Sequence, residues 1–88
     1  MNPRQADILG LEALTWLVGE DEALGRFQGQ TGIDGSDLRA GAGSPELAVS
    51  VFDFLLLNED LLLKFCETGS TIPKQVHAAR NILAGPQY

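Results

Sequence analysis

Two stretches of this 88-residue chain repeat one pattern of apolar and charged residues at a constant offset of 38. Residues 9–27 align with residues 47–65. The apolar positions that coincide are Leu9 with Leu47, Trp16 with Phe54, Leu17 with Leu55, Leu24 with Leu62 and Phe27 with Phe65. Such a period is typical of one supersecondary unit that is stacked on, or paired with, a copy of itself.

The repeat predicts one helical domain over residues 1–88, divided into similar half-units of about 2–43 and 44–86. A chain of this length is too short for two independent cores. Two origins fit the alignment equally well. Either a three-helix unit has been duplicated, or two helical hairpins share the same amphipathic phase without common ancestry.

Residues that typically begin helices recur along the chain and predict helices throughout. Asn2-Pro3 and Ser44-Pro45 each combine a capping residue with proline at the first helical position, and Asn58 is expected to cap a later helix. No segment alternates with the period of two that a half-buried strand needs. We therefore expect an all-α, compact bundle of about six short helices, arranged as two three-helix halves. The expected helices cover about residues 3–18, 21–31, 34–42, 45–57, 59–68 and 73–84.

The helix over residues 3–18 carries a wide apolar arc, and we expect Leu11, Leu14 and Val18 to belong to its buried side. Gly10 lies in the middle of this arc. Its missing side chain either allows a close approach by another helix or marks a tolerated weak point, and both interpretations fit the sequence.

Composition excludes several classes of protein. The net charge of −6 and the scattering of only six Lys and Arg residues argue against broad binding to a phosphate backbone. No apolar stretch reaches the roughly 20 residues of a membrane-spanning helix, because residues 58–60 interrupt the most apolar segment. The start of the chain lacks the order of a secretory signal, and the single cysteine excludes an internal disulfide. These features predict a cytoplasmic protein that does not bind membranes.

Few residues suit catalysis or metal binding. Cys66 and His77 are one of each type, which cannot supply the three or four ligands of a zinc site. We interpret Cys66 as a buried structural thiol and His77 as a solvated side chain. The acidic clusters at 20–22 and 59–60 begin helices, where carboxylates complement the helix dipole. The sequence predicts no enzyme, no cofactor and no metal.

An asymmetry between the two halves points to a candidate binding surface. Where the first half has Gly19 and Gly25, the second has Leu57 and Leu63. Excess apolar surface often marks an interface, so Leu57 and Leu63, with Leu56, are candidate contacts for a protein partner or a second copy of the chain. The alternative is that the joint between the two helices is simply better buried.

A second candidate surface is the strip of Lys74, His77 and Arg80 on the last expected helix, which carries no acidic residue. The order of helix, glycine-containing turn and helix over residues 61–81 is also that of a helix-turn-helix motif. A solvated basic face is the favoured interpretation of the strip, because any helical hairpin with a glycine turn produces this order of elements. The strip is therefore a candidate contact for an acidic partner or a nucleic acid.

Three segments of the chain resemble a known family. DFLLLNEDLLLKF at 53–65 precedes a P-x-x-V-x-x-A-R segment at 73–80, and LGRFQGQTGIDGSDLR stands at 24–39. Together they resemble a family of small, uncharacterised alphaproteobacterial proteins catalogued as a domain of unknown function. The resemblance implies a bacterial, cytoplasmic, helical protein and transfers no catalytic residue. Ile72 departs from the pattern, since aspartate would be the better N-cap before Pro73.

From these observations we expect a non-enzymatic protein-interaction or regulatory module that uses an apolar helical surface. The alternative is a helix-turn-helix-like nucleic-acid binder that uses the last helix.

Overall fold

The computed structural model describes residues 1–85, which form six helices and no strand. This confirms the prediction of an all-α bundle. Pro86, where the second half-unit is expected to end, lies outside the described residues. The helices are α1 Pro3–Val18, α2 Asp21–Thr31, α3 Gly35–Gly41, α4 Pro45–Leu57, α5 Glu59–Gly69 and α6 Pro73–Ala84.

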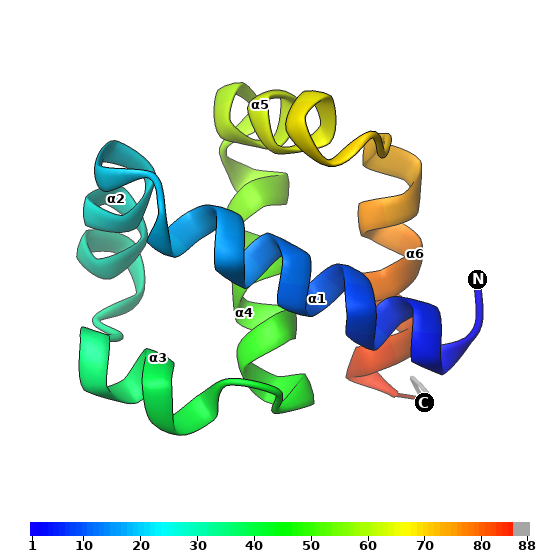
Figure 1. The fold of residues 1–88 in the computed structure, drawn as a ribbon, viewed down its shortest axis with the longest axis horizontal. Coiled ribbons are helices and arrows are strands. Elements are labelled where there is room, and N and C mark those ends of the chain that lie inside the picture. The colour runs from blue at the N-terminus through cyan, green and yellow to red at the C-terminus, as the bar shows by residue number, and fades with distance from the viewer. Residues whose placement is uncertain (86–88) are drawn as a thin grey trace.

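Three helices, α1, α4 and α6, pack on one another and form the centre of the molecule. Figure 1 shows α1 crossing in front of α4, with α2 and α6 on either side. Helix α5 lies across one end and connects α4 to α6, whereas α3 lies at the opposite end, beyond α2. One side of α1 therefore faces the core and the other faces outward.

The expected caps at the start of each half are present. The Asn2 side chain accepts a hydrogen bond from the Gln5 N–H, and the Gln5 side chain accepts one from the Asn2 N–H, which completes a capping box. The Ser44 hydroxyl accepts from the Leu47 N–H at 3.2 Å. Local sequence thus defines where α1 and α4 begin.

The expectation that Asn58 caps α5 is wrong, since its side chain makes no capping bond. Its amide nitrogen instead donates to the Phe54 carbonyl oxygen at 2.7 Å and to the side chain of Gln30 at 3.0 Å. Its amide oxygen accepts from Gln30 at 3.1 Å and from Arg26 at 3.5 Å. Asn58 therefore ties the corner between α4 and α5 to α2.

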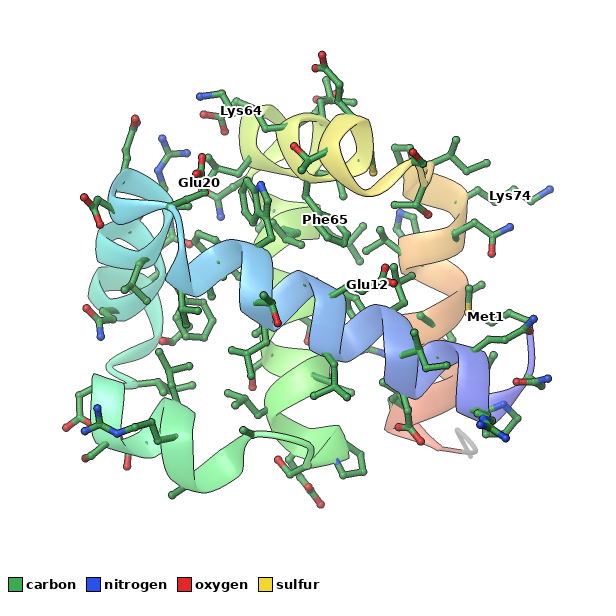
Figure 2. All side chains as sticks on the ribbon, in the orientation of Figure 1. Met1, Glu12, Glu20, Lys64, Phe65 and Lys74 are labelled. Carbon is green, nitrogen blue, oxygen red and sulfur yellow. The ribbon has the colours of Figure 1, made fainter. Side chains whose placement is uncertain are left out.

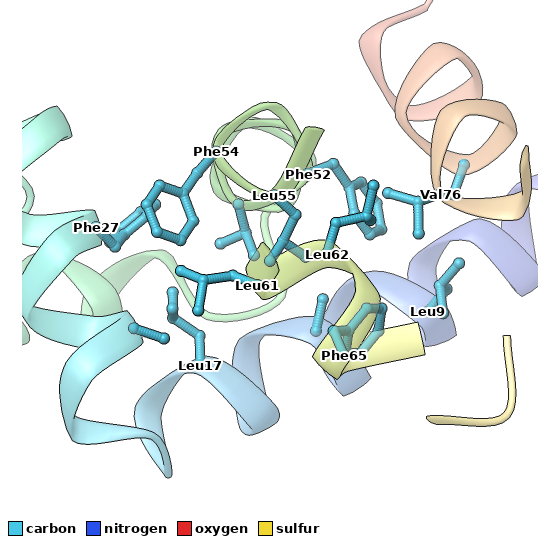
Figure 3. Packing of buried hydrophobic residues seen from close by; sticks show 14 of the residues in the cluster. Leu9, Leu17, Phe27, Phe52, Phe54, Leu55, Leu61, Leu62, Phe65 and Val76 are labelled. Atoms are coloured by element: carbon cyan, nitrogen blue, oxygen red, sulfur yellow. The ribbon is translucent and has the colours of Figure 1, made fainter. Parts of the chain in front are cut away.

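The core is one apolar cluster with contributions from all six helices. Two aromatic pairs connect the halves within it: Trp16 meets Phe65 edge-on at 5.8 Å between ring centroids, and Phe27 meets Phe54 at 5.2 Å. The two pairs are equivalent in the repeat, because Trp16 aligns with Phe54 and Phe27 aligns with Phe65 at the offset of 38. The largest fully buried side chains are those of Phe27, Phe52, Phe65, Leu17, Leu55, Val51 and Val76, several of which are labelled in Figure 3.

Gly10 lies where α1 passes close to α4. A methyl group built on Gly10 would lie only 2.9 Å from the Cβ of Ala48, so the glycine is required for close packing and is not a tolerated weak point. Gly10 and Ala48 are themselves related by the offset of 38. The two aromatic pairs and this contact all join positions that the offset of 38 exchanges between α1–α2 and α4–α5. The last helices of the two halves, α3 and α6, differ in length, with seven and twelve residues. Common ancestry of the halves stays a prediction.

Candidate interaction surface

The outer side of α1 carries an apolar stripe, which we call the α1 face and define as Ile8, Leu11, Leu14 and Val18. Ile8, Leu11 and Val18 are 49%, 48% and 47% exposed, and Leu14 is half-buried. The expectation that Leu11 and Val18 are buried is therefore wrong. The core contacts of α1 with α2, α4 and α6 occupy only part of its wide apolar arc. Leu14 packs against the edge of the core, whereas Ile8, Leu11 and Val18 are left exposed.

An open groove of about 420 Å³ borders the α1 face on the side of α3. Leu14, Thr15 and Val18 form one wall, and Leu38 of α3 contributes to the opposite wall. Arg39 is the only charged residue that lines the groove, and it forms no ion pair with any residue in 1–85. The groove is thus an apolar surface with one cation at its edge.

Helix α3 leaves the groove open because it is short and loosely packed. It ends at Gly41, and Leu38 is its only buried residue. Its start is well defined, since the Asp34 side chain accepts a hydrogen bond from the Asp37 N–H at 2.9 Å. This backbone hydrogen bond, helped by Ser36, lowers the pKa of the Asp34 carboxyl below its ordinary value. The capping box holds α3 in place without bringing it onto α1.

The leucines proposed from the asymmetry of the halves lie in different environments. Leu57, at the end of α4, is 83% exposed, and Leu63 of α5 is 52% exposed. Leu56 is half-buried and packs against the core. The joint between α4 and α5 therefore does not bury Leu57 or Leu63, and both stay available as candidate contacts.

One residue of the basic strip of α6, Arg80, is paired with an acidic residue of another helix. The Arg80 Nε donates to the Asp53 carboxylate of α4 at 2.8 Å, and this hydrogen bond raises the pKa of Arg80 above its ordinary value. Lys74 and His77 are exposed, and Figure 2 shows Lys74 directed away from the body of the molecule. This ion pair is not predictable from the sequence, because Asp53 is 27 positions away on another helix.

Two other titratable side chains have surroundings set by the fold, one through burial and the other through ion pairs. Cys66 is buried, and burial raises the pKa of its thiol. Arg26 bridges Asp60 of α5 at 3.0 Å and Glu22 of α2 at 3.3 Å. No group of three or more His, Cys, Asp or Glu residues within 1–85 is placed to hold a metal ion.

Comparison with models of known protein families finds a match for this chain. The model of the family described as "Protein of unknown function (DUF3572)" matches residues 3–86, nearly the whole chain. The chain belongs to the DUF3572 family. The match confirms the expected domain of unknown function. No curated protein and no solved structure matches the chain.

Within residues 1–85 of this DUF3572 domain, no helix combines the length and the apolar character that crossing a bilayer requires.

Proposed function

We propose that this DUF3572 domain is a non-enzymatic protein-interaction or regulatory module that binds a helix of a partner protein on the α1 face. The observation that carries the proposal is that Ile8, Leu11 and Val18 are each about half exposed on one helix, at whose C-terminal end Val18 also lines an apolar groove. Exposed apolar stripes of this kind are typical of surfaces that accept an amphipathic helix.

The energetic argument is simple. Full burial of a leucine or valine side chain stabilises by about 1.5–3 kcal/mol, so covering the exposed half of Leu11 or Val18 contributes roughly 1 kcal/mol each. The charges also favour a protein partner over a nucleic acid. The net charge is −6, and Arg80 of the basic strip is paired with Asp53.

Two matched double variants test the proposal. Leu11→Lys with Val18→Lys alters the α1 face, and Leu57→Lys with Leu63→Lys alters two exposed apolar positions elsewhere with the same gain of charge. Both pairs are exposed, so circular dichroism should show an intact fold in each. Each variant and the wild type are then used for affinity capture from the native cell extract, and the captured protein is localised on the domain by cross-linking.

The α1 variant should lose the captured protein, and the α4–α5 variant should retain it. The reverse result would move the interface to Leu57 and Leu63, the candidates from the sequence. Equal retention by both variants would contradict the proposed use of either surface. A dimer seen by sedimentation, and lost only in one variant, would identify that surface as a contact between two copies.

A further inference from the structure

The molecule contains its own example of a helix bound to an equivalent face. Helix α6 packs on α4, and the ion pair of Asp53 with Arg80 marks the side of α4 that α6 covers. Val49, Phe52 and Leu56 lie on this side by their helical spacing. Phe52 is fully buried, and Figure 3 shows it directed toward Val76 of α6. Val49 and Leu83 border a common hollow at the other end of the contact. The two helices therefore run in opposite directions, since early residues of α4 meet late residues of α6.

The offset of 38 maps this covered face of α4 onto the α1 face, because Leu11, Leu14 and Val18 correspond to Val49, Phe52 and Leu56. The two faces differ in what covers them. On α4 the cover is a helix of twelve residues, whereas the counterpart on the α1 side is α3, with seven. The residue of α3 that corresponds to Val76 is Leu38, which is buried, and α3 ends three residues later.

We infer that the α1 face binds a partner helix of the same chemistry as α6. This inference rests on the proposed function and names its ligand. The partner helix is amphipathic, runs antiparallel to α1, and places apolar residues at the spacing of Val76, Ala79 and Leu83. In α6, Val76 and Ala79 are buried in the core and Leu83 packs against it, so the spacing is one that this framework accommodates.

Charge distinguishes the partner helix from α6. Arg39 lines the groove beside Leu14 and Val18, toward the C-terminal end of α1. On an antiparallel helix, that end of α1 meets the N-terminal turn of the partner, where an acidic residue is also favoured by the helix dipole. In α6 the corresponding turn carries Lys74. The partner helix therefore has an acidic residue where α6 has Lys74.

A second copy of the chain does not supply this helix. Val76 and Ala79 are fully buried in the core of their own molecule, so α6 is not available to a neighbour. The partner helix must come from another protein.

The probe is a helix-stabilised synthetic peptide of residues 72–85 with the change Lys74→Glu, checked for helicity and titrated to millimolar concentration into the methyl-labelled full chain. We expect saturable shifts of the Leu11, Leu14 and Val18 methyl signals, with a Kd of about 10–1000 μM. The peptide that keeps Lys74 should bind about two- to fivefold more weakly, as expected for one exposed ion pair. A peptide with Val76→Asp should not bind.

Variants of the domain complete the test. Leu11→Lys with Val18→Lys should weaken binding at least about tenfold, whereas Leu57→Lys with Leu63→Lys should leave it unchanged. Arg39→Glu should reverse the preference between the two peptides.

The inference is overturned by the absence of shifts at millimolar peptide, by shifts confined to α4, which would indicate exchange with the native α6, or by dimerisation through the α1 face without peptide. Equal binding of the Glu and Lys peptides would overturn the assigned acidic residue. If the peptide fails while affinity capture still depends on Leu11 and Val18, the proposed function stands and only the α6-like chemistry is wrong.

Discussion

The contact between Gly10 and Ala48 allows a quantitative prediction. In Gly10→Ala the new methyl group would lie 2.9 Å from the Ala48 Cβ, whereas carbon atoms in favourable contact are about 3.5–4.0 Å apart. Helices α1 and α4 must separate locally by up to about 1 Å to relieve this overlap. Overpacking of this kind costs about 1–3 kcal/mol, and the better helix propensity of alanine offsets roughly 1 kcal/mol.

The net expectation is that Gly10→Ala lowers the free energy of unfolding by up to about 2 kcal/mol. The matched control is Gly25→Ala in α2, where no atom lies within 4 Å of the new methyl group. That change should raise the free energy of unfolding by about 0.5–1 kcal/mol. Urea unfolding followed by far-ultraviolet circular dichroism measures both values.

A double variant isolates the steric cause. Gly10→Ala with Ala48→Gly moves one methyl group from α4 to α1 and restores the space between the helices. Its free energy of unfolding should exceed, by at least about 1 kcal/mol, the value obtained by adding the effects of the two single changes. If Gly10→Ala stabilises the protein as Gly25→Ala does, or if the effects of Gly10→Ala and Ala48→Gly are additive, close packing at Gly10 does not constrain the fold.

Three further predictions concern single side chains. Ile72→Asp should raise the melting temperature by about 4–8 °C, because Ile72 has the extended backbone of an N-cap but offers no capping bond to α6. Cys66 should react with a thiol reagent only after unfolding, because burial raises the pKa of its thiol; rapid reaction of the native protein would contradict this. The hydrogen bond from Arg26 lowers the pKa of Asp60 from its ordinary value of 3.8, so the bond's contribution is present above that pH and is lost as the pH falls through the lowered value. The urea midpoint should therefore fall more steeply below about pH 4 in the wild type than in Asp60→Asn.

The helix starts were predictable because their signals are local. Asn2 with Pro3 and Ser44 with Pro45 act within one turn, and no distant contact competes with them. Asn58 was not predictable in the same way. Its side chain forms hydrogen bonds with Gln30 of α2, which lies 28 positions earlier in the chain. These bonds take the side chain away from the local capping role.

The candidate surface could be predicted only in part. Leu57 and Leu63 are exposed, as the comparison of the halves suggested, but Leu11 and Val18 were assigned to the core. A helical wheel shows which residues share a side and cannot show how much of a wide apolar arc finds a neighbour. The exposure of the α1 face depends on the length and position of α3, which are properties of the assembled fold.

Trp16 is the only tryptophan of the chain, and its ring rests against Phe65, a residue of the other half. Its fluorescence therefore reports on the assembly of two segments that are distant in sequence, while circular dichroism reports on helix formation. Coincident unfolding curves from the two signals would mean that the half-units gain their structure in one cooperative step. A tryptophan signal lost at lower urea would mean that the helices persist after the halves have parted.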